Sequence, residues 1–186
     1  MAIIRITTPS IADDAIDNTK LDLGDDYTFT GTVEGAGGGI FESQLLHVQD
    51  QKSSGTDGGD RNVGIQTRDL NTIRTNEITG ASLSSNQITL PAGTYYIKAE
   101  TDTYGDGAKV QAYLYSVTDG SNEIIGNSTV GNYIRSASVI GRFTTATTRV
   151  YELRQYSSGA RATNGLGLAS GQTTEIYTDV QIWKVA

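Results

Sequence analysis

The chain has 186 residues, a formal net charge of −7, one histidine and no cysteine. The lack of cysteine excludes disulfides, thiol chemistry and cysteine-rich zinc sites, and an acidic chain with scattered Lys and Arg offers no electrostatic footprint to nucleic acid or to an anionic membrane. No run of about 18 apolar residues predicts a membrane span, and the first residues lack the pattern of a secretory signal, so we expect synthesis in a cytoplasm.

Near the start, residues 9–24 (PSIADDAIDNTKLDLG) carry an apolar side chain at every fifth position, at Ile11, Ile16 and Leu21. Five residues turn an α-helix by about 500°, so these side chains would not share one helical face. The Asp-rich composition further disfavours a helix. We interpret the segment as an extended docking arm that becomes ordered when its three apolar side chains enter pockets on a partner. The alternative is an acidic tail that binds nothing.

A short strand and a glycine run follow the arm. Residues 27–33 alternate threonine with Tyr, Phe, Gly and Val, which predicts a strand that cannot be stable alone. The run EGAGGGI at 34–40 is typical of a flexible linker, with a close-packed crossing of the chain as the alternative. We therefore divide the chain into an arm (1–34), a glycine-rich linker (35–40) and a body (41–186).

The body begins with two predicted strands. Residues 41–50 (FESQLLHVQD) predict the first strand, residues 52–62 a polar loop, and residues 63–73 (VGIQTRDLNTI) the next strand. Later segments alternate in the same way, and the alternation predicts which side chains share one face of a strand. These sets are Ile88 with Leu90; Tyr95, Ile97 and Ala99; Val110, Ala112 and Leu114; and Ile176, Thr178, Val180 and Ile182.

Turns separate these strands, for example at Pro91–Gly93 and Asp119–Gly120, and no segment has a convincing helical pattern. Many short strands with glycine-rich turns indicate an all-β, antiparallel sandwich or barrel. A jelly-roll sandwich suits a body of this size.

Several strands carry apolar or aromatic residues on both faces, as where Tyr113 and Tyr115 lie opposite Leu114. A sheet with one solvated face is more polar on that face. The second face therefore packs against another subunit, or the tyrosines lie at the surface. The candidates for a subunit interface or a sugar-stacking surface are Tyr95, Tyr96, Tyr113, Tyr115 and Trp183, with packing inside the body as the alternative.

No catalytic motif is present. The single histidine, His47, lies in the first body strand and has no cysteine or serine motif near it, so we expect no enzyme. Paired carboxylates leave a glycosidase reading open, at Glu100 with Asp102 or at Asp57 with Asp60.

Two loops carry Asp beside Gly, TDGGD at 56–60 and YGDG at 104–107. Their oxygens suit calcium, although neither loop has the full spacing of an EF-hand. Turns that use Asp and Gly for local hydrogen bonds and positive φ explain both loops. We therefore expect no cofactor, with calcium left open.

Four segments of the body resemble the C1q and tumour-necrosis-factor-like jelly roll. They are ITLPAGTYYIKAE (88–100), KVQAYLYSV (109–117), TTRVYELRQYSSG (147–159) and TTEIYTDVQIWKV (173–185). The resemblance covers residues 41–186. It implies a homotrimer whose three heads pack around an axis.

A second resemblance joins the arm to the body. SIADDAIDNTKLDL (10–23), a Phe-Thr-Gly strand, a glycine run and a C1q-like head together resemble tailed-bacteriophage head-fibre, decoration or tail-fibre proteins. The resemblance implies a virion location, with the arm docked on the major capsid protein or on another virion protein.

The leading hypothesis is therefore a structural virion protein of a tailed phage. It would be made in the host cytoplasm and displayed on the virion surface as a homotrimeric capsid decoration or head fibre. One alternative is a tail-fibre or spike tip that binds a host-surface glycan, and a second is a polysaccharide depolymerase. The sequence does not choose between a capsid and a tail location.

Overall fold

The computed structural model describes residues 44–131 and 133–185. This part of the chain forms eleven strands and no helix. The predicted docking arm with Ile11, Ile16 and Leu21, the strand at 27–33 and the glycine run lie outside the described residues.

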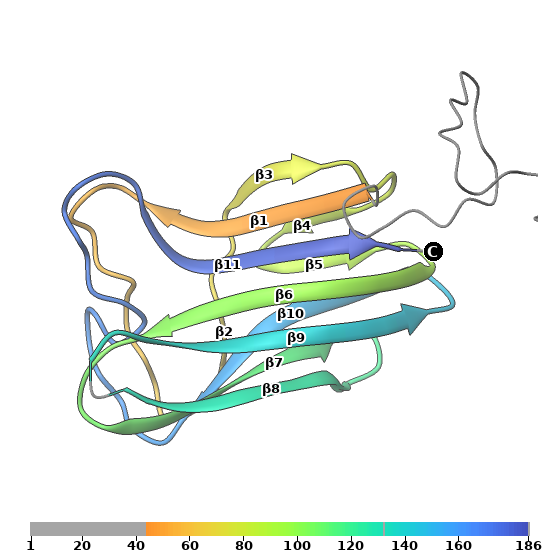
Figure 1. The fold of residues 1–186 in the computed structure, drawn as a ribbon. Helices are drawn as coiled ribbons and strands as arrows, with labels where there is room; N and C mark the ends of the chain where they lie inside the picture. The colour runs from red at the N-terminus through yellow and green to blue at the C-terminus, as the bar shows by residue number, and fades with distance from the viewer. Residues whose placement is uncertain (1–43, 132, 186) are drawn as a thin grey trace, which may run out of the picture. The chain divides into compact units, whose positions relative to one another are not determined.

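The strands form two antiparallel sheets (Figure 1). The β1 sheet has the order β3 (Thr72–Asn76), β1 (Gln44–Lys52), β11 (Glu175–Lys184), β6 (Gly93–Thr103), β9 (Arg135–Thr145). The β10 sheet has the order β4 (Ser82–Ser84), β5 (Gln87–Leu90), β10 (Arg149–Ser157), β7 (Ala108–Ser116), β8 (Ser121–Gly131), and β2 (Gly64–Thr67) also pairs with β10. Most neighbouring strands, such as β1 with β11 and β6 with β9, come from distant parts of the sequence, as in a jelly roll, so the predicted fold class is confirmed.

The alternation of β5, β6 and β7 places the predicted side chains in the interior. The members of the first three predicted sets are all at most 1% exposed. The turn at Pro91–Gly93 carries the chain from β5 in one sheet to β6 in the other. Local alternation therefore identified both inward faces correctly.

The predicted strand at 63–73 is wrong, because two strands occupy this segment. β2 lies in the β10 sheet and β3 lies in the β1 sheet. Residues 68–71 cross between the sheets, where the Arg68 amide donates to the Leu153 carbonyl and the Asn71 amide donates to the Gln49 carbonyl. A sequence window cannot distinguish one long strand from two short strands joined by a crossing.

The alternation predicted for β11 fails at its first residues. The pairing of β1 with β11 shifts register between Asp50 and Gln51, so that Tyr177 becomes an extra residue. Tyr177 and Thr178 are both buried, and Ile176 turns outward and is 45% exposed. This is a β-bulge, in which two residues oppose one and the alternation is interrupted.

The interior changes character along the strands. One half of the sandwich is filled by hydrophobic side chains, and we call it the apolar half: Leu46, Val48, Ile88, Leu90, Tyr95, Ile97, Leu114, Phe143, Tyr151, Leu153, Val180 and Ile182. The other half contains the buried polar side chains, beside small apolar ones such as Ala112 and Ala137, and we call it the arginine half. Its polar members are Arg61, Arg68, Thr101, Thr103, Gln155, Ser157 and Thr178. The change occurs within β6, β10 and β11 alike, because Thr101 pairs with Thr178 and the Arg68 side chain contacts both Thr178 and Gln155.

Candidate functional site

The predicted surface aromatics do not lie together. Tyr95 is fully buried, stacks on Phe143 with ring centroids 5.5 Å apart, and donates its hydroxyl to the Pro91 carbonyl at 2.7 Å. Burial raises the pKa of Tyr95 to about 12. The prediction that Tyr95 belongs to an outer surface is therefore wrong, because the alternation of β6 turns it inward while Tyr96 turns outward.

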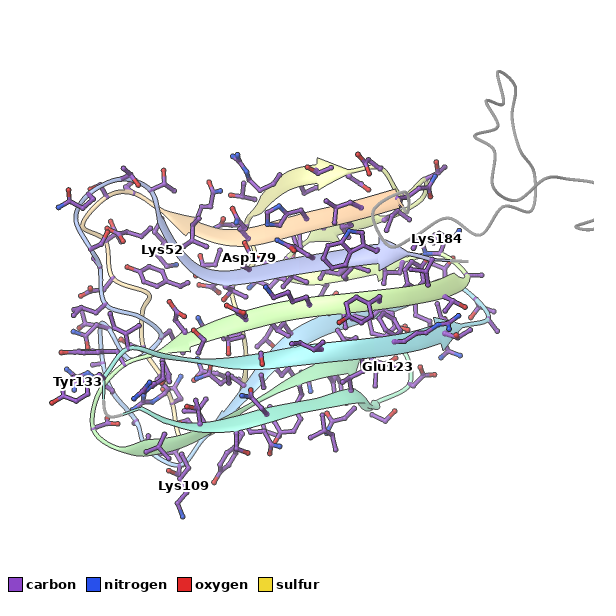
Figure 2. All side chains as sticks on the ribbon, viewed as in Figure 1. Lys52, Lys109, Glu123, Tyr133, Asp179 and Lys184 are labelled. Carbon is purple, nitrogen blue, oxygen red and sulfur yellow. The ribbon has the colours of Figure 1, made fainter. Side chains whose placement is uncertain are left out.

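Tyr96 and Trp183 are partners on the outer face of the β1 sheet, with ring centroids 6.1 Å apart. Leu45 pairs with Trp183 on the other side, and Ile140 of β9 is 52% exposed on the same face. We call Leu45, Tyr96, Ile140 and Trp183 the aromatic strip. Leu45, Trp183 and Tyr96 are direct cross-strand neighbours on β1, β11 and β6, and Ile140 of β9 lies diagonal to Tyr96, which itself pairs with Arg142. The strip lies near the end at which Figure 2 labels Lys184.

Tyr113 and Tyr115 lie on the outer face of the opposite sheet. The Arg154 guanidinium lies 3.5 Å from the centre of the Tyr115 ring, and its Nε donates to Glu152 at 2.7 Å. The Tyr113 hydroxyl donates to Gln111 Oε1 at 2.7 Å. Both tyrosines are thus engaged within the chain, and they are separated from Tyr96 and Trp183 by the whole thickness of the sandwich.

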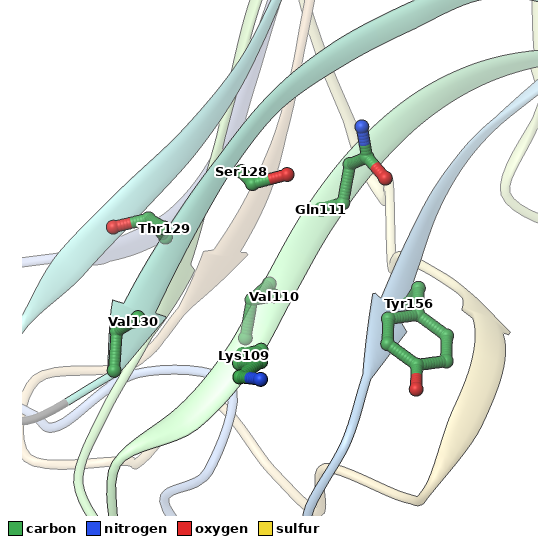
Figure 3. Close-up of a pocket in the computed structure, with 7 residues that line it drawn as sticks. All are labelled: Lys109, Val110, Gln111, Ser128, Thr129, Val130 and Tyr156. Atoms are coloured by element: carbon green, nitrogen blue, oxygen red, sulfur yellow. The ribbon is translucent and has the colours of Figure 1, made fainter.

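An apolar groove of about 360 Å³ lies beside these tyrosines, above β7 (Figure 3). Its lining is Lys109, Val110, Gln111, Ser128, Thr129, Val130 and Tyr156. Tyr156 of β10 flanks one side and Val130 of β8 the other, and Ile65 next to Tyr156 is 62% exposed. The Gln111 amide already donates to the Gly126 carbonyl at 3.1 Å. The groove therefore combines the apolar surfaces of Val130 and Tyr156 with the polar side chains of Lys109, Ser128 and Thr129.

A second cavity, of about 380 Å³, lies on the outer face of the β1 sheet. We call it the polar cavity, and its lining is His47, Gln49, Gln51, Arg74, Thr173, Thr174 and Ile176. The lining comes from β1, from β3 and from the segment that leads into β11. It lies toward the β1 end marked by Lys52 in Figure 2, away from Lys184.

Hydrogen bonds fix one wall of the polar cavity. Gln51 Nε2 donates to Gln49 Oε1 at 2.7 Å, and the Gln49 amide donates in turn to the Asp179 carboxylate. His47 Nε2 lies 2.9 Å from Asp179 Oδ2. Asp179 therefore anchors two lining residues, and His47 is a hydrogen-bonded residue of a strand face, as its position in the sequence suggested.

The carboxylates considered for a glycosidase have structural partners. Asp102 accepts a hydrogen bond from the Ser136 hydroxyl at 2.7 Å, and burial raises the pKa of its carboxyl. Glu100 lies on the same strand face, 3.8 Å from the Lys98 ammonium. Asp57 accepts from the Ala169 amide at 2.8 Å.

The two loops considered for calcium use their carboxylates to join loops. Asp60 accepts from the Thr163 amide at 2.5 Å, and Asp106 forms an ion pair with the buried Arg61. Within residues 44–131 and 133–185, no three His, Asp or Glu side chains cluster closely enough to hold a metal ion. Asp106 also accepts from the nearby Ala108 amide at 3.3 Å, so its carboxylate supports both its own turn and the contact with Arg61.

Arg68 is the centre of the arginine half. It is completely buried, and its guanidinium donates to Thr178 Oγ1, Gln155 Oε1 and the carbonyls of Leu166 and Tyr177 at 2.8–3.3 Å. Burial lowers the pKa of Arg68 to about 10, so the side chain remains a cation at neutral pH. One charge thus joins both sheets and the loop before β11.

Arg61 plays the same part closer to the loops. Its guanidinium donates to the Thr103 hydroxyl at 2.7 Å and to the carbonyls of Gly159 and Tyr104 at 3.0 Å. Its backbone pairs with that of Arg161 in an isolated bridge. Three loops therefore converge on one buried side chain.

Sequence analysis missed the exposed Arg74 and the two buried arginines, Arg61 and Arg68. Arginine is mostly exposed in proteins, and nothing local in GDRNVGIQTRD distinguishes a buried arginine from a solvated one. The only available signal was the polar character of Thr101, Thr103 and Gln155 at positions that alternation assigns to the interior.

No helix in the portion of the chain that the structure describes could cross a membrane.

No protein-family model and no curated protein matches the sequence. Two crystal structures of murine APRIL, at pH 8.5 and pH 8.0, are similar to this chain with a TM-score of 0.51 and 10% identity, covering 76% of this chain and 99% of APRIL. At this identity the similarity shows the fold, and the fold is a C1q/TNF-like jelly roll.

Proposed function

We propose that this chain is a homotrimeric display protein of a tailed-phage virion, attached through its N-terminal arm and presenting the jelly roll on the particle surface. The observation that carries the trimer is the aromatic strip, an apolar band on a sheet face of an isolated chain. Ile140 is exposed, and Leu45, Tyr96 and Trp183 are half-buried. Apolar surface left open to solvent in this way marks contact surfaces.

A ring of three identical chains needs two different patches on each chain, because its interfaces are heterologous. The aromatic strip supplies one patch. The edge where β8 meets β9 supplies the second, with Ile125 65% exposed. That edge is well ordered: Ser138 of β9 donates its amide to Asn127 Oδ1 of β8 at 2.5 Å, and a side chain at Gly126 would collide with the Ser138 carbonyl.

The virion location rests on the resemblance of the arm, the glycine run and the head to phage virion proteins. The arm would bind the major capsid protein or another virion protein through Ile11, Ile16 and Leu21. A segment that becomes ordered only on the assembled shell adds its binding free energy to the stability of that shell.

Size-exclusion chromatography with light scattering tests the trimer. The full chain should have the mass of three copies, and Ile125→Glu should be monomeric because a charge at the interface has no partner. Ile65→Glu is the matched control, since Ile65 has nearly the same exposure but lies on β2, which pairs with β10 and is not part of the edge where β8 meets β9, and it should remain trimeric. A monomeric wild-type chain at micromolar concentration would refute the trimer.

Removal of residues 1–24 tests the arm. The shortened chain should keep the far-ultraviolet circular dichroism of a β protein and should no longer sediment with particles. Particles decorated as well by the shortened chain as by the full chain would place the anchor elsewhere.

A second candidate function is attachment to a host-surface glycan. The observation that favours it is the polar cavity, which combines a cation, amides and hydroxyls. A glycan array with the full chain tests it, and saturable binding is the expected result.

A further inference from the structure

We propose that the polar cavity is a binding site for a carboxylated saccharide, with Arg74 as the residue that receives the carboxylate. This inference deepens the second candidate function and does not depend on the trimer or on the virion location. The polar cavity has a volume of about 380 Å³, which falls in the range of about 300–1,000 Å³ that is typical of small-ligand sites.

Arg74 has its position because β3 is irregular. The pairing of β1 with β3 shifts register between His47 and Val48, so that His47 pairs with Thr75, Val48 pairs with Ile73, and Arg74 is the extra residue. Bulges of this kind redirect a side chain and recur beside binding sites. Here the bulge brings Arg74 to the lining of the polar cavity.

Arg74 forms no ion pair with any residue that the structure describes. It is also the one lining residue with a permanent formal charge, because Asp179, which hydrogen-bonds to His47 and Gln49 from the neighbouring strand β11, is not part of the lining. A guanidinium binds a carboxylate through two parallel hydrogen bonds. The charge of the lining therefore selects an anion.

The remaining polar groups suit hydroxyls. Gln49 is 6% exposed and donates to Asp179 of the neighbouring strand β11, so its amide is fixed in place. Gln51, Thr173 and Thr174 add an amide and two hydroxyls, which donate and accept hydrogen bonds equally well. Several fixed donors and acceptors beside a single cation match a polyol that carries one carboxylate.

Ile176 supplies the apolar part of the site. The bulge at Tyr177 turns Ile176 outward, and its side chain is 45% exposed within the lining. A sugar ring presents C–H groups on one face, and an exposed aliphatic side chain can pack against that face and remove both surfaces from water. Two bulges, one in β3 and one in β11, thus converge on the same cavity.

Titration of the full chain with sodium D-glucuronate, followed by amide chemical shifts in NMR, tests the inference. Glucuronate should bind saturably and shift resonances of the cavity lining. D-glucose, which has the same ring without the carboxylate, and sodium acetate, which has the carboxylate without the ring, should each bind at least about tenfold more weakly. Equal binding of acetate would overturn the saccharide assignment.

Arg74→Gln should weaken glucuronate binding at least about tenfold while light scattering and the melting curve stay as in the wild type. Arg142→Gln is the matched control, because Arg142 lies on the outer face of the same sheet, opposite Tyr96, and makes the same change in net charge. An equal loss in both variants, or no binding of glucuronate by the wild-type chain, would overturn the site. A monomer that still binds would refute the trimer alone.

Discussion

The two halves of the sandwich interior are stabilised by different interactions, hydrophobic packing in one and hydrogen bonds from buried guanidiniums in the other. In the apolar half, buried side chains such as Leu114, Leu153 and Val180 pack together through hydrophobic contacts, which have no directional requirement. In the arginine half, the Arg61 and Arg68 guanidiniums donate hydrogen bonds to specific hydroxyls and carbonyls. Hydrophobic burial is proportional to area and tolerates some repacking, whereas a buried cation tolerates only a complete set of partners.

The difference follows from what each half must hold. The apolar half lies between strands, whose backbone groups already pair within the sheets. The arginine half lies beside the long loops, where the backbone carbonyls of Tyr104, Gly159 and Leu166 point inward and need donors. An arginine with five N–H donors satisfies several carbonyls at once. The buried arginines of this protein therefore donate hydrogen bonds to backbone carbonyls of the loops.

The largest expected effect comes from breaking the arginine half. Arg68→Ala removes the cation and leaves two carbonyls, Gln155 and Thr178 without their donor, so the free energy of unfolding should fall by about 3–5 kcal/mol. Urea unfolding followed by fluorescence of the single Trp183 measures it.

The matched control is Arg74→Ala, six positions along the chain. Arg74 is exposed and forms no ion pair with the described residues, so its loss should change the free energy of unfolding by no more than about 0.5 kcal/mol. Similar losses in the two variants would contradict the special role of buried Arg68.

In the apolar half, shortening a buried side chain should destabilise the protein by leaving a cavity. Leu114 of β7 is completely buried, and Leu114→Ala should lower the free energy of unfolding by about 2–4 kcal/mol through lost burial and incomplete collapse. The same urea experiment measures it. Leu114→Met should cost under about 1.5 kcal/mol, because it conserves volume, and an equal loss for Ala and Met would argue against close packing there.

The loops of the arginine half should make the protein sensitive to acid. Backbone amides of Ser170, Gly55 and Gly171 donate to the Glu175 carboxylate and lower its pKa to about 2. A carboxyl whose pKa is lower in the folded state adds stability above its unfolded pKa, and that contribution is lost as pH falls from about 4.5 toward 2.

Melting temperatures of the wild type and Glu175→Gln, measured from pH 7 to pH 2, test this. The difference between them should be largest at neutral pH and should shrink through this window. A difference that is the same at every pH would show that Glu175 acts through packing alone.

The smallest expected effect concerns the polar group within the apolar half. Tyr95→Phe removes the hydrogen bond to the Pro91 carbonyl and keeps the stacking on Phe143, so the free energy of unfolding should fall by about 0.5–1.5 kcal/mol. Thermal unfolding is sufficient to measure it. A loss as large as that of Leu114→Ala would mean that the turn at Pro91–Gly93 depends on this hydroxyl.

The candidate sites show how far sequence analysis reached. It identified Tyr96 and Trp183 as outward-facing aromatics, and they lie together on one face. It grouped them with Tyr113 and Tyr115, which lie on the opposite face, because alternation gives the face of a strand but not the sheet to which that strand belongs. The polar cavity was not predicted, since its lining depends on two bulges that no local pattern announces.

By itself, the sequence determined the all-β class, the inward faces of β5, β6 and β7 and the tight turns, because alternation and turn chemistry act over a few residues. Only the tertiary structure decided that Arg61 and Arg68 are buried in the interior and that Arg74 lines a cavity. The partners of Arg68 lie 87 to 110 positions away in the chain, and a buried charge is stable only where folding brings such partners together.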